Sequence, residues 1–168
     1  MLDVQSMAIS SLEKHKQEIV SFVFERDYVD FILLEMDRFD QPMTKTLLSF
    51  LQRRYGDDYW FCVDISGDQR IDAHVIAGPE KDKDNLNVVH IYSIAVRRQF
   101  EGQGWAKKLM LEVINKAKKK QVDAIVLEVR DNNDRALQFY LHLGFIVTGE
   151  IKEYYTEEID AITMRLDL

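Results

Sequence analysis

The sequence predicts one α/β (or α+β) domain built around a mixed β-sheet, and three neighbouring segments carry this prediction. Residues 87–96 (NVVHIYSIAV) are β-branched and aromatic, as expected of a strand. Residues 105–120 (WAKKLMLEVINKAKKK) are apolar at helical spacing, and residues 123–130 (DAIVLEVR) are typical of a buried strand. A strand, a helix and a second strand in this order form a crossover unit. Because hairpins are predicted on both sides of this unit, the whole sheet is expected to be mixed.

The rest of the chain predicts helices and hairpins around this crossover unit. Thr44 is a typical N-cap and Gly56 a typical end for one helix, and Asn133 and Gly144 frame another in the same way. The further predicted elements are a strand at 19–24, helices at 27–39, 45–55 and 134–143, a hairpin over 59–78, a charged loop at 79–85, and strands at 145–151 and 159–168 around a loop that holds Tyr154 and Tyr155.

Composition narrows the class of protein. A length of 168 residues with 46% hydrophobic and 30% charged residues fits one ordinary globular domain. No apolar segment is long enough to span a bilayer, and the N-terminus lacks the features of a secretory signal. Cys62 is the only cysteine, and its strand-like surroundings predict a small buried hydrophobe rather than a nucleophile. We therefore expect a cytoplasmic protein with no membrane partner and no internal disulfide.

Charge is unevenly distributed along the chain. The formal net charge of -7 argues against a nucleic-acid partner, since such proteins present positive charge to the phosphate backbone. Residues 97–120, however, hold eight basic and two acidic side chains and so carry +6, which leaves -13 for the remainder. This polarity suggests one surface for a small polyanion and another for a cationic partner, or simply a solvated helix face.

The first candidate site is the junction between strand and helix at 97–108 (RRQFEGQGWAKK). Gly102 and Gly104 allow a tight turn and a close approach of the backbone to a ligand, and the first N–H groups of the next helix attract anions. Arg97, Arg98, Lys107 and Lys108 add full positive charges. The stretch predicts a phosphate site, with an ordinary turn as the alternative. It lacks the third glycine of a dinucleotide fingerprint and the Lys-Ser/Thr of a Walker loop.

Two longer segments resemble the signature segments of the GNAT acetyltransferases. The first, SIAVRRQFEGQGWAKKLM, fits the family's Gln/Arg-x-x-Gly-x-Gly/Ala loop in two registers, Gln99–Gly104 or Glu101–Ala106. The second register aligns residues 109–110 with the usual Leu-Leu pair but puts Glu101 where Gln or Arg is typical. The other segment, LEVRDNNDRALQFYLHLGF, matches the pattern Asn-x-x-Ala-x-x-x-Tyr-x-x-x-Gly-Phe at every position from Asn133 to Phe145.

The resemblance implies a cosubstrate and the residues that hold it. It implies acetyl-CoA, with backbone amides of the glycine-rich loop around the pyrophosphate, and no metal. Strand residues would bind the pantetheine, and Asn133 would contact the cosubstrate or order the loop. The candidate cofactor-binding residues are Ile94, Ala95, Val96, Gly102, Gln103, Gly104, Trp105, Ala106, Lys107 and Asn133.

The chemistry requires a general base, because a primary amine is mostly protonated near neutral pH. Two residues qualify: Glu128, a carboxylate between apolar neighbours on a strand, and His90, whose ordinary pKa of about 6.5 suits base chemistry. Either of them is equally compatible with a satisfied polar group at a strand edge. The ending EYYTEEIDAITMRLDL and the segment LLEMDRFDQPMT near the front resemble the bacterial ribosomal-protein N-terminal alanine acetyltransferases. That resemblance favours Glu128 as the base and Tyr140 as the acid.

The resemblance covers residues 19–168 and implies one GNAT domain, a mostly antiparallel mixed sheet of about seven strands with about four helices. Residues 1–18 have no counterpart and form an extension in which residues 10–13 hint at a capped helix. The implied activity is direct transfer of an acetyl group from acetyl-CoA to an amine, the acceptor being a protein or peptide N-terminus near Tyr154 and Tyr155. The alternatives are a small-molecule amine or a silent acetyl-CoA-binding module. An oligomer is compatible with each.

Overall fold

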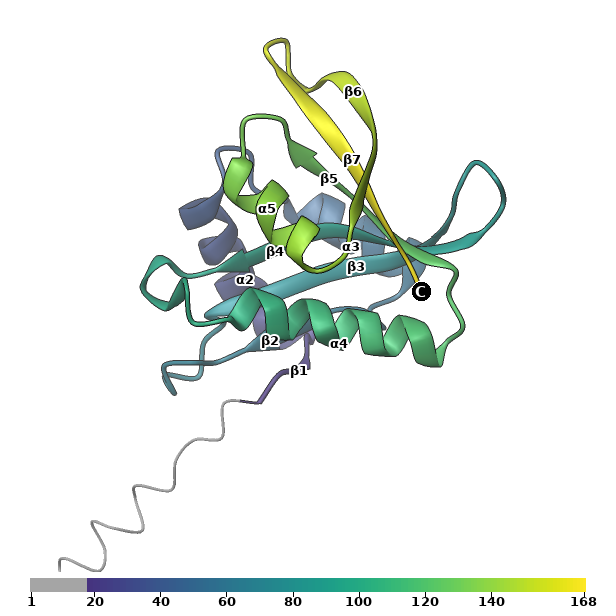
Figure 1. Ribbon diagram of the computed structural model, residues 1–168. Helices are drawn as coiled ribbons and strands as arrows, with labels where there is room; N and C mark the ends of the chain where they lie inside the picture. Colours follow the sequence, from purple (N-terminus) through teal and green to yellow (C-terminus); the bar gives the residue numbers. More distant parts are fainter. Residues whose placement is uncertain (1–17) are drawn as a thin grey trace, which may run out of the picture.

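The computed structural model describes residues 18–168, and the capped helix expected at residues 10–13 lies outside them. Within the described part, strands and helices follow one another in the predicted order (Figure 1). They are β1 (Val20–Ser21), α2 (Phe24–Arg38), α3 (Lys45–Tyr55), β2 (Phe61–Val63), β3 (Ala73–Lys81), β4 (Asn87–Val96), the short 3-10 helix η1 (Arg98–Phe100), α4 (Trp105–Lys119), β5 (Ala124–Arg130), α5 (Asp134–His142), β6 (Ile146–Thr156) and β7 (Ile159–Asp167).

The strands form one mixed sheet, as predicted. Their order is β1-β2-β3-β4-β5-β7-β6, and every neighbouring pair is antiparallel except β4 and β5. Helices α4 and α5 lie in front of the sheet in Figure 1, and α2 and α3 lie behind it. Residues 18–168 contain no helix long and apolar enough to cross a membrane and no group of three His, Cys, Asp or Glu side chains that could hold a metal ion.

Each face of the sheet has its own apolar core. On the α4 side, the predicted stripe of Leu109, Val113 and Ala117 is fully buried, which confirms the amphipathic helix. On the other side, α2 and α3 contribute a second cluster that includes Cys62. Burial raises the pKa of the Cys62 thiol to about 12, so this residue is the small buried hydrophobe that the sequence predicts.

A buried polar cluster fastens α2 to the sheet. The Glu35 carboxylate accepts a hydrogen bond from Ser93 Oγ at 2.5 Å, and its Oε1 lies 2.9 Å from His74 Nε2. Its other oxygen accepts from the backbone N–H of Met43 at 2.9 Å. Burial alone would raise the pKa of Glu35, but these bonds outweigh it and lower the pKa. The ionised carboxylate therefore ties α2 to β3 and β4.

Two predicted boundaries near the N-terminal half are wrong. The first strand is only two residues long, because the Asp27 carboxylate accepts a hydrogen bond from Val23 N–H at 2.7 Å and the chain enters α2 at Phe24. The charged segment at 79–85 is not all loop, since β3 continues to Lys81. Strand β2 begins at Phe61, opposite Val75, so Pro79 lies beyond β2, where β3 pairs with β4 alone, and proline is tolerated at such an edge.

The predicted loop around Tyr154 and Tyr155 is also wrong, because both residues belong to β6. Pairing with β7 is irregular between Ile151 and Thr156, so four residues of β6 lie opposite the single residue Asp160. The Asp160 carboxylate accepts hydrogen bonds from the backbone N–H of Glu153 at 2.8 Å and from Lys152 at 2.7 Å. The extra residues are thus held as a bulge in the strand rather than as a free loop.

Strands β4 and β5 are paired over only three residues, Val88–His90 with Ala124–Val126, and then separate. Just after the separation, β4 carries a bulge: Ala77 pairs with Ile91 and Ile76 with Ser93, which leaves Tyr92 as an extra residue. A one-residue slip exchanges the faces of all later side chains. After the bulge, therefore, Ile94 and Val96 face α4, while Ser93 and Ala95 face α2.

Candidate active site

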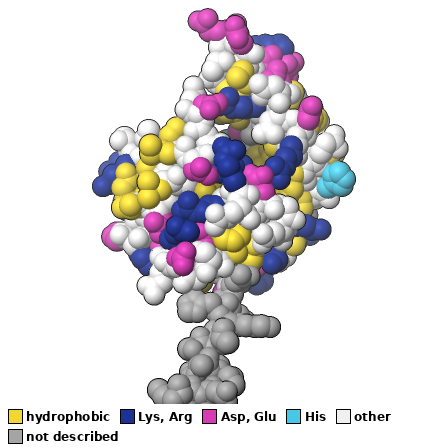
Figure 2. All heavy atoms as spheres, turned by 90° about the vertical axis from the view of Figure 1, so that its left-hand side faces the viewer, with side chains coloured by type: hydrophobic (Ala, Val, Ile, Leu, Met, Phe, Trp, Pro, Cys, Tyr) yellow, Lys and Arg dark blue, Asp and Glu magenta, His cyan; other side chains and the backbone are white. Residues whose placement is uncertain are grey.

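A cavity of about 850 Å³ opens where β4 and β5 separate. The end of β4, the turn before α4, and α5 form its walls. Figure 2 shows this face of the molecule, with Lys and Arg side chains around a hollow and hydrophobic side chains within it. The predicted site residues that line the cavity are Ile94, Ala95, Val96, Gly102, Gly104, Trp105, Ala106, Lys107, Asn133 and Tyr140.

Three predicted site residues do not line this cavity. Gln103 turns away, and its side-chain amide donates a hydrogen bond to the Gln99 carbonyl at 3.3 Å. Glu128 and His90 lie together on the other face of the sheet, in contact with β3. The structure thus gathers the phosphate-loop residues and Tyr140 on one side of the gap between the strands, and both candidate bases on the other.

The glycine-rich turn has the backbone geometry of an anion cradle. Gly102 and Gly104 have φ angles of 74° and 83°, a region that other residues rarely adopt. A β-carbon at either position would meet nothing within 4 Å, so conformation and open space, rather than packing, set these glycines. Gly104 is the N-cap of α4, and no side chain of the described residues caps this helix. Its first N–H groups are therefore available to an anion.

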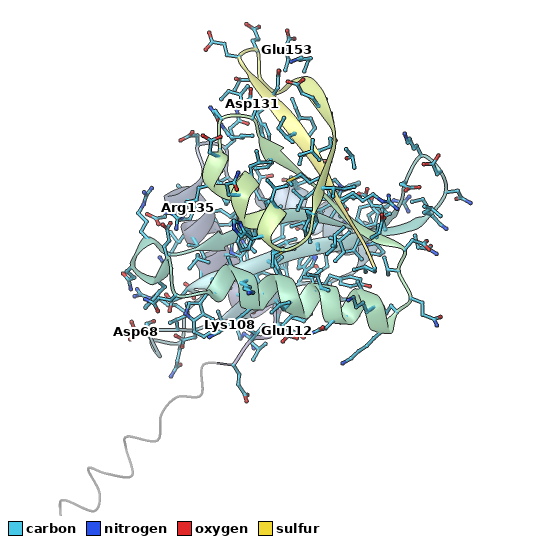
Figure 3. All side chains as sticks on the ribbon, viewed as in Figure 1. Asp68, Lys108, Glu112, Asp131, Arg135 and Glu153 are labelled. Carbon is cyan, nitrogen blue, oxygen red and sulfur yellow. The ribbon has the colours of Figure 1, made fainter. Side chains whose placement is uncertain are left out.

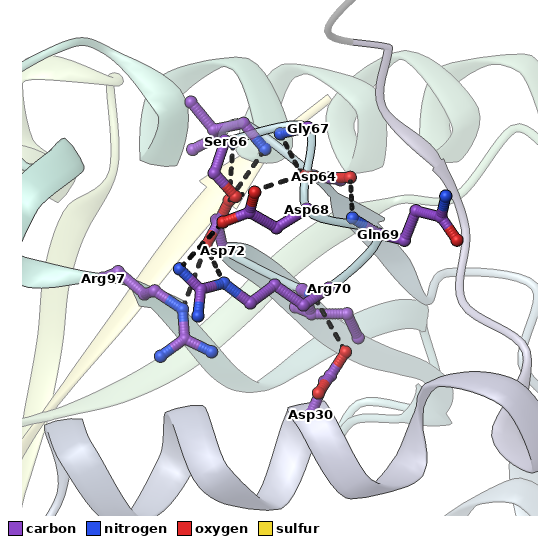
Figure 4. Close-up of polar contacts among 11 residues, drawn as sticks. Asp30, Asp64, Ser66, Gly67, Asp68, Gln69, Arg70, Asp72 and Arg97 are labelled. Atoms are coloured by element: carbon purple, nitrogen blue, oxygen red, sulfur yellow. Dashed lines mark hydrogen bonds and ion pairs between the residues drawn. The ribbon is translucent and has the colours of Figure 1, made fainter.

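A fully buried carboxylate anchors the start of this turn (Figure 4). Asp72 accepts hydrogen bonds from Arg97 Nε at 3.0 Å and, through its backbone carbonyl, from Arg97 N–H at 2.8 Å. Its second oxygen accepts from Ile65 N–H at 3.0 Å and from the backbone and hydroxyl of Ser66 at 2.8 and 2.7 Å. Arg97 therefore fixes the start of the turn by its bonds to Asp72, although the sequence suggested that its charge would bind the ligand.

Glu101, which departs from the family pattern, is held between two arginines. Its carboxylate pairs with Arg38 at the end of α2 and with Arg135 in the first turn of α5, the latter at 2.6 Å. The hydrogen bond from Arg135 is the main cause that lowers the pKa of Glu101. All three residues lie on the cavity wall, so an ionised carboxylate belongs to the positively charged rim.

On the opposite face, strand register brings three titratable residues together. His90 pairs with Gly78 of β3 and with Val126 of β5, so Glu80 and Glu128 are its diagonal neighbours. His90 Nε2 lies 2.6 Å from Glu128 Oε2, and Nδ1 lies 3.2 Å from Glu80 Oε2. Both ring nitrogens therefore have a carboxylate partner.

Two carboxylates change the proton affinity of this imidazole. Burial alone would lower the pKa of His90, but the hydrogen bonds to Glu128 and Glu80 outweigh it and raise the pKa to about 9. The bond to His90 likewise lowers the pKa of Glu80. At neutral pH the ring is an imidazolium, which has no lone pair with which to accept a proton. Of the two candidate bases, the arrangement leaves the carboxylate of Glu128 available.

Sequence reasoning missed Glu80 and Tyr92 as members of this cluster. The Tyr92 hydroxyl donates a hydrogen bond to Glu80 Oε1 at 2.6 Å, and its ring lies 4.8 Å from that of His90. Glu80 was missed because it fell in a segment assigned to a loop. Recognising that β3 continues past Pro79 would have provided the signal, since Glu80 then points to the same face as Gly78.

Tyr140 reaches the cavity from α5. Its ring packs edge to face against Phe139 and Phe145, at 5.1 and 5.6 Å between centroids. Burial raises the pKa of Tyr140, so its hydroxyl keeps its proton at neutral pH. At the start of the same helix, Asn133 Oδ1 accepts a hydrogen bond from Ala136 N–H at 3.1 Å, which confirms the predicted N-cap.

The bulge of β6 brings two tyrosines over β5. The Tyr155 hydroxyl donates a hydrogen bond to the backbone carbonyl of Glu128 at 3.2 Å, and Arg130 lies 4.8 Å from the Tyr155 ring centre. Tyr154 packs against Tyr155 and stays half exposed. Burial is the main cause that raises the pKa of Tyr154, with the Glu128 charge adding to it. The two tyrosines therefore border the face that holds Glu128.

The Glu80–His90–Glu128 cluster predicts a specific pH dependence of stability. The folded pKa of about 9 exceeds the unfolded value of about 6.5, so the stabilisation is fully present below pH 6.5 and is lost as pH rises through 9. It amounts to about 3 kcal/mol at most. We expect the difference in unfolding free energy between the wild type and His90→Gln, measured by urea denaturation, to shrink from pH 6.5 to 9.5. Parallel profiles would contradict the assignment.

Comparison with known proteins identifies the fold family. The sequence profile described as the acetyltransferase (GNAT) family matches residues 22–145. N-alpha-acetyltransferase 30 of Saccharomyces cerevisiae is 37% identical over 79 residues, which are 47% of this chain and 45% of the yeast protein. The ribosomal protein bS18 alanine N-acetyltransferase of Haemophilus ducreyi is 34% identical over 70 residues, 42% of this chain and 48% of that protein. The matches thus span about half the length of these relatives.

Solved structures agree over a larger share of the chain. The NatC complex bound to Gag peptide and CoA contains a chain with a TM-score of 0.80 and 25% identity, covering 90% of this chain and 99% of that one. The ribosomal-protein-S18-alanine N-acetyltransferase from Escherichia coli has a TM-score of 0.76 and 25% identity, covering 90% and 93%. Since the family profile also covers most of the chain, including the turn before α4 and the whole of α5, this protein belongs to the GNAT family of acetyltransferases.

Proposed function

We propose that this protein transfers the acetyl group of acetyl-CoA to the N-terminal α-amine of a polypeptide. The observation that carries the proposal is the gap between β4 and β5, with an anion cradle and Tyr140 on one side and Glu128 on the other. A thioester that enters from the cavity and an amine that enters from the opposite face would meet in this gap. That arrangement favours direct transfer, with both substrates bound at once.

The residues of the cavity fit acetyl-CoA. Gly102, Gly104 and the uncapped start of α4 offer backbone N–H groups for the pyrophosphate, and Lys107 adds a charge. Ile94 and Val96 present the free edge of β4 to the amide groups of pantetheine, because β5 has already separated there. Bound acetyl-CoA supplies an acetyl group joined to a thiol leaving group. The proposed cofactor residues are those predicted from the sequence, with Gln103 contributing its backbone alone.

Glu128 and Tyr140 provide the two proton transfers. Glu128 Oε2 is occupied by His90, which leaves Oε1 to take a proton from the acceptor ammonium group and produce the nucleophilic amine. His90 therefore acts as a positioning residue rather than as the base. Tyr140, a protonated phenol on the cavity wall, donates a proton to the departing sulfur.

The acceptor is proposed from the charge around Glu128. Glu80 and Glu128 together outnumber the single positive charge of His90, so the cluster favours a cationic ammonium group. Tyr154, half exposed beside Glu128, offers an aromatic surface for the first side chain of a peptide. The yeast relative is named an N-alpha-acetyltransferase and the Haemophilus ducreyi relative a ribosomal-protein alanine N-acetyltransferase, which supports a polypeptide N-terminus over a small amine.

The acceptor assignment is tested by incubating the protein with labelled acetyl-CoA and either a library of peptides with free N-termini or a panel of polyamines, aminoglycosides and amino acids. We expect label on peptide α-amines, detected by mass spectrometry. Label only on small amines would replace the proposed acceptor. Binding of acetyl-CoA without transfer to any amine would instead identify a silent binding module.

The acid role of Tyr140 predicts a kinetic effect without a binding effect. Tyr140→Phe removes the proton donor but keeps the packing against Phe139 and Phe145. We expect kcat to fall at least tenfold, about 1.4 kcal/mol in the transition state, while the Kd for CoA stays within twofold. The matched control is Tyr59→Phe, a buried tyrosine of the same core that does not line the cavity. An unchanged kcat in Tyr140→Phe would refute the role.

The cradle predicts a difference between two glycines that both have a positive φ. Gly104→Ala puts a β-carbon into the proposed phosphate site at a φ of 83° and a ψ of 7°. Gly56→Ala strains the backbone more, at a φ of 75° and a ψ of -176°, and Gly56 does not line the cavity. Gly104→Ala should lose about 1 kcal/mol of stability, and Gly56→Ala should lose more, because its backbone region is essentially restricted to glycine. Only Gly104→Ala should also weaken CoA, roughly tenfold by calorimetry. Equal CoA affinities in the two variants would argue against a phosphate at Gly104.

A further inference from the structure

Glu101 is an acidic residue on a mostly basic rim, where Arg38, Lys107, Arg130 and Arg135 line the cavity and Asp40 is the other acidic lining residue. It directly precedes Gly102 in the turn, and its carboxylate bridges Arg38 of α2 and Arg135 of α5. The three side chains come from three separate elements and all line the cavity. The carboxylate side chain is 24% exposed, so its charge is only partly screened by water.

Neither guanidinium is saturated by this carboxylate. Arg38 Nη1 is buried and has no hydrogen-bond partner among residues 18–168. Arg135 is 73% exposed, so its side chain can turn to another anion at little cost (Figure 3). A buried donor without an acceptor is unusual in a folded protein and indicates that an acceptor belongs beside it. Arg38 lines the cavity, so a rotation of its guanidinium group would bring this donor to a phosphate oxygen there.

A bound polyphosphate would face two opposing effects at this point. Arg38 and Arg135 attract it, but Glu101 repels it and already forms an ion pair with each of the two guanidinium groups. A carboxylate that only braced the arginines would sit behind them, away from the ligand. Glu101 instead lines the cavity together with both arginines and directly precedes the cradle glycine Gly102.

We propose that Glu101 is a placeholder for phosphate: it holds the two arginines while the cradle is free and releases Arg135 to the cosubstrate when CoA binds. This inference rests on the proposed function, which puts the CoA pyrophosphate in the turn at 102–107. Because the ion pair with Glu101 must be broken for each binding event, CoA binds less tightly than the basic rim would otherwise allow. Glu101 thereby promotes release of the CoA product.

The test is the sign of the change in CoA affinity. Glu101→Gln keeps the shape of the side chain and removes its charge. We expect calorimetry at 50 mM NaCl to give a Kd for CoA at least fivefold lower than in the wild type. The affinity should also fall more steeply between 50 and 300 mM NaCl, because two freed guanidinium groups then interact with the phosphates. CoA should become a correspondingly stronger product inhibitor.

Two further variants control for charge and for folding. Glu112→Gln removes the same charge from an exposed site on α4 and should leave the Kd unchanged (Figure 3). In an Arg135→Gln background, Glu101→Gln should gain less affinity than in the wild type, since one of the released groups is missing. The comparison in the Arg135→Gln background also tests the role of Glu101 if Glu101→Gln alone folds poorly.

The outcomes separate this inference from the function on which it rests. A wild-type protein that fails to bind CoA would overturn both. A wild type that binds CoA, with Glu101→Gln binding it equally or more weakly, would overturn the placeholder alone and identify Glu101 as a brace. Equal tightening in Glu101→Gln and Glu112→Gln would overturn it as well, because net charge would then explain the change.

Discussion

The separation of β4 from β5 is the constraint on which the rest of the site depends. Three residue pairs hold the parallel strands together, and beyond His90 and Val126 each strand has a free edge. Free edges inside a sheet are costly unless something pairs with them, because backbone N–H and C=O groups need partners. The fold therefore contains a slot that a ligand with its own amide groups can complete. Every proposed site residue lies at the rim of this slot or on an element that begins beside it.

The bulge at Tyr92 exchanges the faces of the sheet to which the later side chains of β4 point. Ahead of it, His90 faces the Glu80 and Glu128 cluster; after it, Ile94 and Val96 face the cavity beneath α4. In the proposed reaction, β4 would therefore serve both substrates, the amine on one face and the thioester on the other. The Glu35 cluster at Ser93 fixes the strand at this position, so the change of face stays in place.

How much could be predicted from the sequence depended on how local each feature is. Tyr140 lies on the short helix α5, and Asn133 and Gly144 flank that helix, so their spacing alone predicts where they lie. The glycines before α4 are local in the same sense. The His90 cluster is different, because it depends on the register of three strands, and Glu128 lies 38 residues from His90 along the chain. His90 and Glu128 were each identified as candidates, but their 2.6 Å contact, and the role of Glu80, appear only once those registers are known.

Glu101 shows the limit of reading charge from a sequence. Its position among basic residues looked like a mismatch with the family pattern, yet its two partners lie 63 and 34 residues away along the chain. Arg97 shows the reverse error: the sequence suggested that its charge would bind the ligand, but Arg97 pairs with the buried carboxylate of Asp72. Asp72 in turn closes the connection between β2 and β3, so one carboxylate fastens two separate turns. Amides in both turns should therefore open together in hydrogen exchange. The lifetime of the closed glycine-rich turn should then depend on the connection between β2 and β3, which does not line the cavity.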